Sequence, residues 1–364
     1  MVHSLYGTSY TVTYDSSSHW SILTQQWGSL WPKLLPFCLL NVALMGILHI
    51  LLAHGIDMHL SEVGHNFMGF VVSFLLVSRV SMGVARYYEA RECLENMNKS
   101  CRQLVHTACV YSNLDQSIRA KEWRSEICYT TLVLLRSTMA VIDYPSMGIK
   151  VLDLPELQGT LLEHLQRSNT STTRWLHEPR SAQEENIRVP IQISYLLRKV
   201  IRSQEGRIEP AIPVIAEGDL YAFVNSIMDG YYGLHKFITT PFPFPLLQMS
   251  STFLWFYVFT VPFAMLSIDD NGPLSVACHC AIIFIFTFGF LGMEFVSIQM
   301  DDPFGDDEND FNNLSLAHMV FEDVYVTLDD TDGEEWAAKL RQKMSGGHDK
   351  QLCNETDWLL SGKV

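Results

Sequence analysis

The residues whose types and spacing best suit metal chemistry form an acidic cluster late in the chain. Six carboxylates fall within ten residues of the segment QMDDPFGDDENDF at 299–311. Carboxylates at this density repel one another unless water solvates them or a cation bridges them. Ca2+ takes about six to eight oxygen ligands in a flexible shell, and Pro303 with Gly305 favours a turn. The spacing is not that of an EF-hand, so a solvated acidic surface is the alternative interpretation.

Other kinds of chemistry have little support in the sequence. The eight cysteines form no CxxC pair and no zinc-like grouping, which is typical of small buried apolar residues. The chain also contains no GxSxG, HExxH or Walker motif. A formal charge of −15, from 25 basic and 40 acidic residues, excludes the basic surface of a nucleic-acid-binding protein.

Four apolar stretches are the elements that must position the acidic cluster. A helix needs about 20 apolar residues to cross a hydrocarbon core about 30 Å thick. The stretches 35–53 and 275–298 meet this length, and 251–267 meets it when the preceding apolar residues are included. The stretch 66–77 alone fits a buried core helix equally well, but as one of four it is expected to span, shielded from lipid by the others. We therefore predict an all-α integral membrane protein with four transmembrane helices.

The charges of the connecting segments predict the topology. Segments 54–65 and 268–274 contain no Lys or Arg, whereas 85–236 contains 18 of the 25. The positive-inside rule places the two short loops outside, and the middle segment and both termini in the cytosol. Apolar residues at helical spacing make the middle segment a helical domain. The expected parts are a cytosolic N-terminal segment (1–34), a first transmembrane pair (35–84) and the cytosolic helical domain (85–240). A second transmembrane pair (241–298), the acidic segment (299–311) and a cytosolic tail with a short helix at 336–344 (312–364) follow.

Two motifs carry a family signature. The first is FLLVSRVSMGVARYYEAR at 74–91, and the second is the acidic segment directly after the last apolar stretch. Together with WGSLWPK at 27–33 and PFPFP at 241–245, they resemble the bestrophin family of pentameric anion channels, from about Tyr10 to about Tyr325. The resemblance implies a homopentamer in a lipid bilayer whose central pore, lined by the second span, passes small anions.

The same resemblance implies a regulatory Ca2+ clasp in the acidic segment. Its ligands correspond to the side chains of Asp307 and Asp310 and to backbone oxygens of Gln299 and Asp302, with one more oxygen from the N-terminal stretch 15–19. Familiar animal members carry asparagine at the position of Asp302. Bacterial relatives lack the clasp, so its presence favours calcium dependence.

The pore residues are also assigned by resemblance. Counting back from the arginine motif, the neck corresponds to Phe70, Phe74 and Ser78, which lie on one helix face. Two phenylalanine rings per subunit would form an apolar collar that can gate by dewetting, and Ser78 stands where relatives carry a bulky apolar residue. A cytosolic aperture corresponds to Val214 or Ile215. Ordinary helix packing is the alternative interpretation for all of these residues.

The remaining polar residues of the spans are assigned more simply. Arg86 and Arg91 are expected to pair structurally, whereas the role of Arg79 stays open. Within one span no histidine or glutamate pair has a metal-ligand spacing, so packing or interface roles are expected. These residues are His49, His54, His59, His65, His279 and Glu294.

The leading functional hypothesis is a channel for chloride and bicarbonate, gated by cytosolic Ca2+, in the plasma membrane or, in a photosynthetic host, the thylakoid membrane. The alternatives are a metal-dependent membrane enzyme that uses the acidic cluster and a calcium-sensing scaffold that does not conduct.

Overall fold

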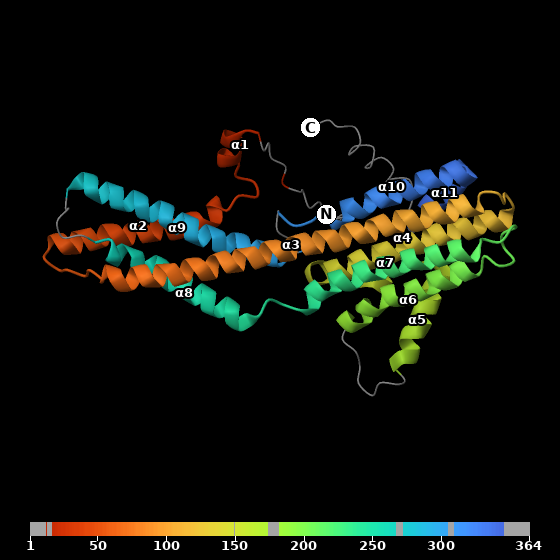
Figure 1. Cartoon of the computed structure of the whole chain (residues 1–364), viewed down its shortest axis with the longest axis horizontal. Coiled ribbons are helices and arrows are strands. Elements are labelled where there is room, and N and C mark those ends of the chain that lie inside the picture. Colours follow the sequence, from red (N-terminus) through yellow and green to blue (C-terminus); the bar gives the residue numbers. More distant parts are fainter. Residues whose placement is uncertain are drawn as a thin grey trace. The chain divides into compact units, whose positions relative to one another are not determined.

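The computed structural model describes residues 12, 17–148, 150–173, 182–266, 272–304 and 309–345 (Figure 1). Every regular element in these ranges is a helix, which agrees with the all-α prediction. The helices are α1 (His19–Thr24), α2 (Trp31–Ala53), α3 (Glu62–Ser112), α4 (Ile118–Met147), the short 3-10 helix η1 (Val151–Asp153), α5 (Gly159–Thr173), α6 (Ala182–Arg202), α7 (Val214–Thr239), α8 (Phe244–Ala264), α9 (Pro273–Asp301), α10 (Asn313–Asp332) and α11 (Glu334–Met344).

The chain forms two compact units, which we describe separately. Unit 1 comprises residues 1–90 and 239–311, and unit 2 comprises 91–238 and 312–364. The boundary falls inside α3, a single helix of 51 residues. The sequence predicted a short span at 66–77 followed by a separate cytosolic domain, because the apolar run ends before Arg79. No proline follows until after α3 ends, so the helix continues through the polar residues.

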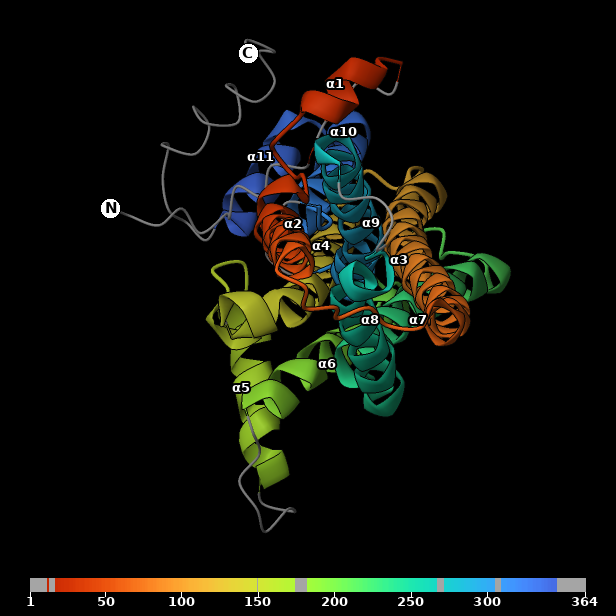
Figure 2. The same ribbon diagram turned by 90° about the vertical axis from the view of Figure 1, so that its left-hand side faces the viewer.

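Unit 1 contains α1, α2, α8, α9 and the first part of α3. The helix α9 packs along both α2 and α8 (Figure 2). One face of α2 forms part of the core, because its buried residues Leu34, Cys38, Met45 and Leu48 recur at helical spacing. At Gly69 of α3, an added Cβ would lie 2.2 Å from the hydroxyl oxygen of Tyr257 in α8. A side chain at position 69 would displace the Tyr257 ring, so glycine allows this ring to lie directly against α3.

Among the described residues, five helices are long and apolar enough to cross a membrane: α2, α3, α4, α8 and α9. They differ in how far the chain itself covers them. In α4, 89% of the apolar window is buried inside the protein, against 17% to 33% in the other four. Other parts of the protein therefore cover the apolar surface of α4. The helices α2, α3, α8 and α9 keep exposed apolar side chains that lipid or other subunits can contact.

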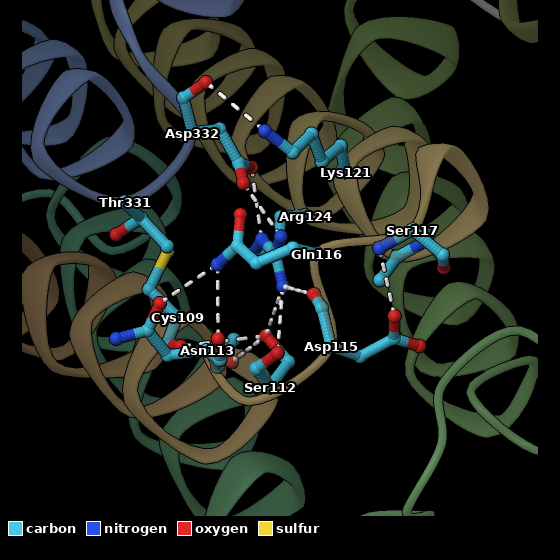
Figure 3. Close-up of polar contacts among 12 residues, drawn as sticks. Cys109, Ser112, Asn113, Asp115, Gln116, Ser117, Lys121, Arg124, Thr331 and Asp332 are labelled. Atoms are coloured by element: carbon cyan, nitrogen blue, oxygen red, sulfur yellow. Dashed lines mark hydrogen bonds and ion pairs between the residues drawn. The ribbon is translucent and has the colours of Figure 1, made fainter.

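Unit 2 is built around α4, which packs against α6, α10 and α11. The segment expected as a tail thus contributes two helices to the unit, and α11 includes the short helix expected at 336–344. Figure 3 shows how α10 is held at its C-terminal end: Arg124 of α4 donates to both carboxylate oxygens of Asp332, at 2.8 and 2.5 Å. Arg124 also donates to the carbonyl of Ser112 at 2.7 Å and so joins the α3–α4 turn to α10. All of this network is inside unit 2.

Candidate functional site

The predicted neck residues lie on a face of α3 that the chain leaves open. The side chains of Phe70 and Phe74 are 75% and 68% exposed, and Ser78 is half-buried. Val72 and Leu76, on the opposite face of the same helix, are buried in the core of unit 1. The two rings are therefore not packing groups within the described part of this chain. They are free to line a pore or to meet another subunit.

Directly after the predicted neck residue Ser78, a buried ion pair joins α3 to α9. Arg79 donates to the carboxylate of Glu294 and, at 3.1 Å, to the hydroxyl oxygen of Ser251 in α8. That hydroxyl in turn donates to the same Glu294 oxygen at 2.7 Å. Asp301, at the end of α9, has a carboxylate oxygen 4.0 Å from Arg79 Nη2. The network ties three helices together at one level and fixes the orientation of α3 next to Ser78.

The other two arginines of the motif contact nearby groups. Arg86 donates to the carbonyl of Thr240 at 3.4 Å, within unit 1. Arg91 lies 3.4 Å from Glu95 one turn later, and both of these side chains are in unit 2. These contacts agree with the structural pairing expected for both residues. The residue whose role the sequence left open, Arg79, is the one that is buried.

The predicted calcium turn follows α9 directly, and the structure describes most of its backbone. The Phe311 N–H donates to the carbonyl of Pro303 at 3.0 Å and closes the segment into a loop. The Asn309 side chain donates to the Gly28 carbonyl at 3.2 Å and to the Gln299 side chain at 3.3 Å. The N-terminal segment thus reaches the turn through Gly28.

The predicted ligands occupy different environments in this turn. Asp310 is buried, whereas Asp302 is exposed and its carboxylate accepts the N–H of Phe304 at 3.4 Å. Gln299 lies in the last turn of α9, where carbonyls have no intrahelical N–H partner. Asp307 lies outside the described residues.

The donors fit a hard cation. Every predicted ligand offers an oxygen, the atom that Ca2+ requires, and the C-terminal end of α9 adds partial negative charge. Among the described residues, no three His, Cys, Asp or Glu side chains gather closely enough to hold a metal ion. The set predicted from the resemblance includes only two carboxylate side chains and assigns its other ligands to backbone oxygens.

The predicted aperture residues begin α7 in unit 2. Val214 and Ile215 are each 84% exposed, so neither side chain packs in the core of its own chain. The structure therefore leaves both as candidates for the aperture.

Sequence reasoning missed several polar contacts between the helices of unit 1. Asn41 of α2 donates to the Val258 carbonyl at 3.0 Å and to the Thr287 hydroxyl at 2.7 Å. His49 of α2 lies 3.2 Å from His279 of α9, measured between ring nitrogens. The signal was present as isolated polar residues in apolar spans, which require partners on neighbouring helices.

Comparisons with known proteins agree with this fold. The family described as Bacterial/Fungal Bestrophin protein matches residues 11–325. A voltage-dependent anion channel-forming protein of Ralstonia nicotianae is 23% identical, and the match covers 88% of this chain and 96% of that protein. Two crystal structures of variants of a bacterial bestrophin homologue from Klebsiella pneumoniae superpose with TM-scores of 0.63 and 0.64 at 17% identity. They cover 80% and 81% of this chain and 97% and 99% of their own chains, and at this identity the likeness is one of fold.

Proposed function

Because this chain belongs to the bestrophin family, we propose that it is a multi-pass membrane channel that conducts chloride and bicarbonate passively. The observation that carries the proposal is the uncovered aromatic face of α3, where Phe70 and Phe74 are exposed next to a helix face buried in the core. An apolar face of this kind in a membrane protein needs lipid, a partner subunit or a pore opposite it. The name of the Ralstonia relative, an anion channel-forming protein, supports anions in general as the permeant ions.

We place the pore on the axis of a homopentamer, as the resemblance of the motifs implies. Five copies of Phe70 and Phe74 form an apolar collar whose ring edges carry partial positive charge and favour a passing anion. Ser78 has a hydroxyl in place of a bulky apolar side chain, so the lower end of the neck is wider and hydrated. The gradient across the membrane drives the flux, and no catalytic step is needed.

Calcium regulation is the second part of the proposal. The side chains of Asp307 and Asp310 and backbone oxygens of Gln299 and Asp302 would hold the ion. Ca2+ supplies positive charge that cancels the repulsion among these carboxylates. The protein's own contribution is the loop that closes between Pro303 and Phe311 directly after α9.

The turn has a structural route to the neck. The helix α9 ends at Asp301 and, two turns earlier, carries Glu294, which binds Arg79 beside Ser78. A displacement of the end of α9 therefore acts on α3 through the buried ion pair. The host membrane is the plasma membrane or, in a photosynthetic organism, the thylakoid membrane.

The test of conduction is flux into liposomes that contain the purified full chain, with and without micromolar Ca2+. We expect chloride and bicarbonate flux that rises with Ca2+. Family membership and the relative's name indicate a channel and not an enzyme, so metal-dependent hydrolysis is not expected. Ca2+ binding without flux would contradict the proposal and favour the non-conducting scaffold.

Two substitutions separate the neck from the turn. S78F adds a ring to the collar and should lower single-channel conductance, whereas L40F, at an exposed apolar position of α2, should leave it unchanged. D310N should shift the Ca2+ dependence to higher concentration, whereas D330N, on the exposed surface of α10, should not. Unchanged conductance in S78F would remove Ser78 from the pore wall.

A further inference from the structure

Two imidazoles from different helices meet in unit 1 without any role in the proposed conduction path. His49 Nε2 of α2 lies 3.2 Å from His279 Nδ1 of α9, although 230 residues separate them in the chain. The ring centroids are 5.3 Å apart and the planes are inclined by 15°, so the rings meet edge to edge with the two nitrogens facing each other. His49 is 6% exposed, whereas His279 is partly exposed.

We propose that this histidine pair is a binding site for Zn2+ or a similar borderline divalent metal. In a tetrahedral site with Zn–N bonds of 2.0–2.1 Å, two ligand nitrogens lie about 3.3–3.4 Å apart. The observed nitrogen–nitrogen distance of 3.2 Å is within a few tenths of an ångström of this value. When the metal binds, the proton between the two nitrogens would be given up, each ring would carry its N–H on its other nitrogen, and small rotations would direct both lone pairs at one ion.

The donor chemistry separates this site from the calcium turn. Neutral imidazole nitrogen suits Zn2+, Cu2+ and Ni2+, whereas Ca2+ and Mg2+ take oxygen ligands. Only two protein ligands converge here, so water would complete the shell from the side on which His279 is exposed. A metal at this point links α2 to α9 and stabilises their packing.

The surroundings of His49 set the strength of the site. Its Nδ1 atom is buried and has no hydrogen-bond partner among the described residues. A metal-ligating histidine normally donates its second N–H to a carboxylate or carbonyl, which raises its basicity. Because His49 lacks this support, we expect binding weaker than at a structural zinc site.

The position of the pair makes it reachable from one side of the membrane. His49 is four residues before the end of α2, and His279 is six residues after the start of α9. At the helical rise per residue, the two imidazoles lie about 6 Å and about 9 Å from these helix ends. Both ends adjoin the segments that the charge pattern places outside.

The test is thermal unfolding of the full chain in detergent, without a polyhistidine tag, as ZnCl2 is added. We expect the unfolding temperature to rise with ZnCl2 and not with MgCl2, because a ligand that binds the folded state stabilises it. H49Q and H279Q should each require at least about tenfold more ZnCl2 for the same rise. H54Q is the control: its exposed imidazole contacts the Ile50 carbonyl at 2.8 Å and should not affect the response.

Two further measurements keep the proposal testable if a variant fails to fold. Protons compete with the metal for imidazole, so the response of the unmodified chain should disappear near about pH 5.5. Co2+ added in place of Zn2+ should give the visible absorption of a tetrahedral complex. Equal responses in the pair variants and in H54Q, no response in the unmodified chain, or a purely octahedral Co2+ spectrum would each overturn the proposal.

Discussion

Removing the carboxylate of Glu294 should strongly destabilise unit 1. Arg79 and Glu294 form an ion pair in which each side chain is only 3% exposed. Breaking a buried pair by removing one partner costs about 3–5 kcal/mol, because the remaining charge stays out of water. Asp301 lies 4.0 Å from Arg79 and partly compensates the guanidinium, so we expect E294Q to lose about 3 kcal/mol, near the lower limit.

The assay is thermal unfolding of the purified chain in detergent, with a double-mutant cycle. E294Q should unfold several degrees below the unmodified chain. The double variant R79M/E294M removes both charges and keeps two unbranched apolar side chains, so it should recover most of the loss. The control is E335Q, which removes an exposed carboxylate 2.7 Å from Lys339 and should have no resolvable effect.

Two results would refute this reasoning. One is an E294Q variant that unfolds no earlier than E335Q, because the Arg79 pair would then behave as a surface contact. The other is a double variant that loses as much as the two single variants combined. In that case the helices would not require charge neutrality at this point.

Three further predictions concern other contacts. In unit 1, G69A places a Cβ 2.2 Å from the Tyr257 hydroxyl oxygen and should cost about 1–3 kcal/mol; Y257F in the same chain should recover part of the unfolding temperature. In unit 2, D332N leaves Arg124 buried without its carboxylate, so the unfolding temperature should fall by at least as much as in E294Q. Burial lowers the pKa of His235 below its ordinary 6.5. The stability that the neutral imidazole contributes above pH 6.5 is therefore lost as the pH falls from 6.5 through the lower pKa of the folded state. The drop in unfolding temperature between about pH 7.5 and about pH 5.5 should be smaller in H235F.

The sequence predicted well those features that depend on a single helix. Apolar runs located α2, α8 and α9. The family resemblance, and not the periodicity, selected Phe70 and Phe74, whose rings lie on the exposed face of α3. The length of α3 could not be predicted in this way. The apolar run ends before Arg79, but helix formation depends on backbone propensity, and no residue between Arg79 and the end of α3 breaks the helix.

Contacts between helices were harder to predict from the sequence, because periodicity identifies the buried face of a helix but not the residues that pack against it. Glu294 and Arg79 are 215 residues apart in the chain. Metal-ligand spacings within one helix cannot reveal His49 and His279, because the two residues lie on different helices. The acidic turn was recognised by its composition and position, whereas the contact between Asn309 and Gly28 depends on the fold.

Depth in the membrane is the signal that could have found both pairs. A residue in a spanning helix lies at a depth set by its distance from the helix end, at about 1.5 Å per residue. Measured from the helix ends that adjoin the outer loops, His49 and His279 lie at about 6 and about 9 Å, and Arg79 and Glu294 at about 26 and about 32 Å. Each pair therefore matches to within about one helical turn, and the two pairs are well separated from each other. Because an isolated polar group in a span needs a partner at its own level, equal depth restricts the possible partners of each residue to a few positions on the other helices.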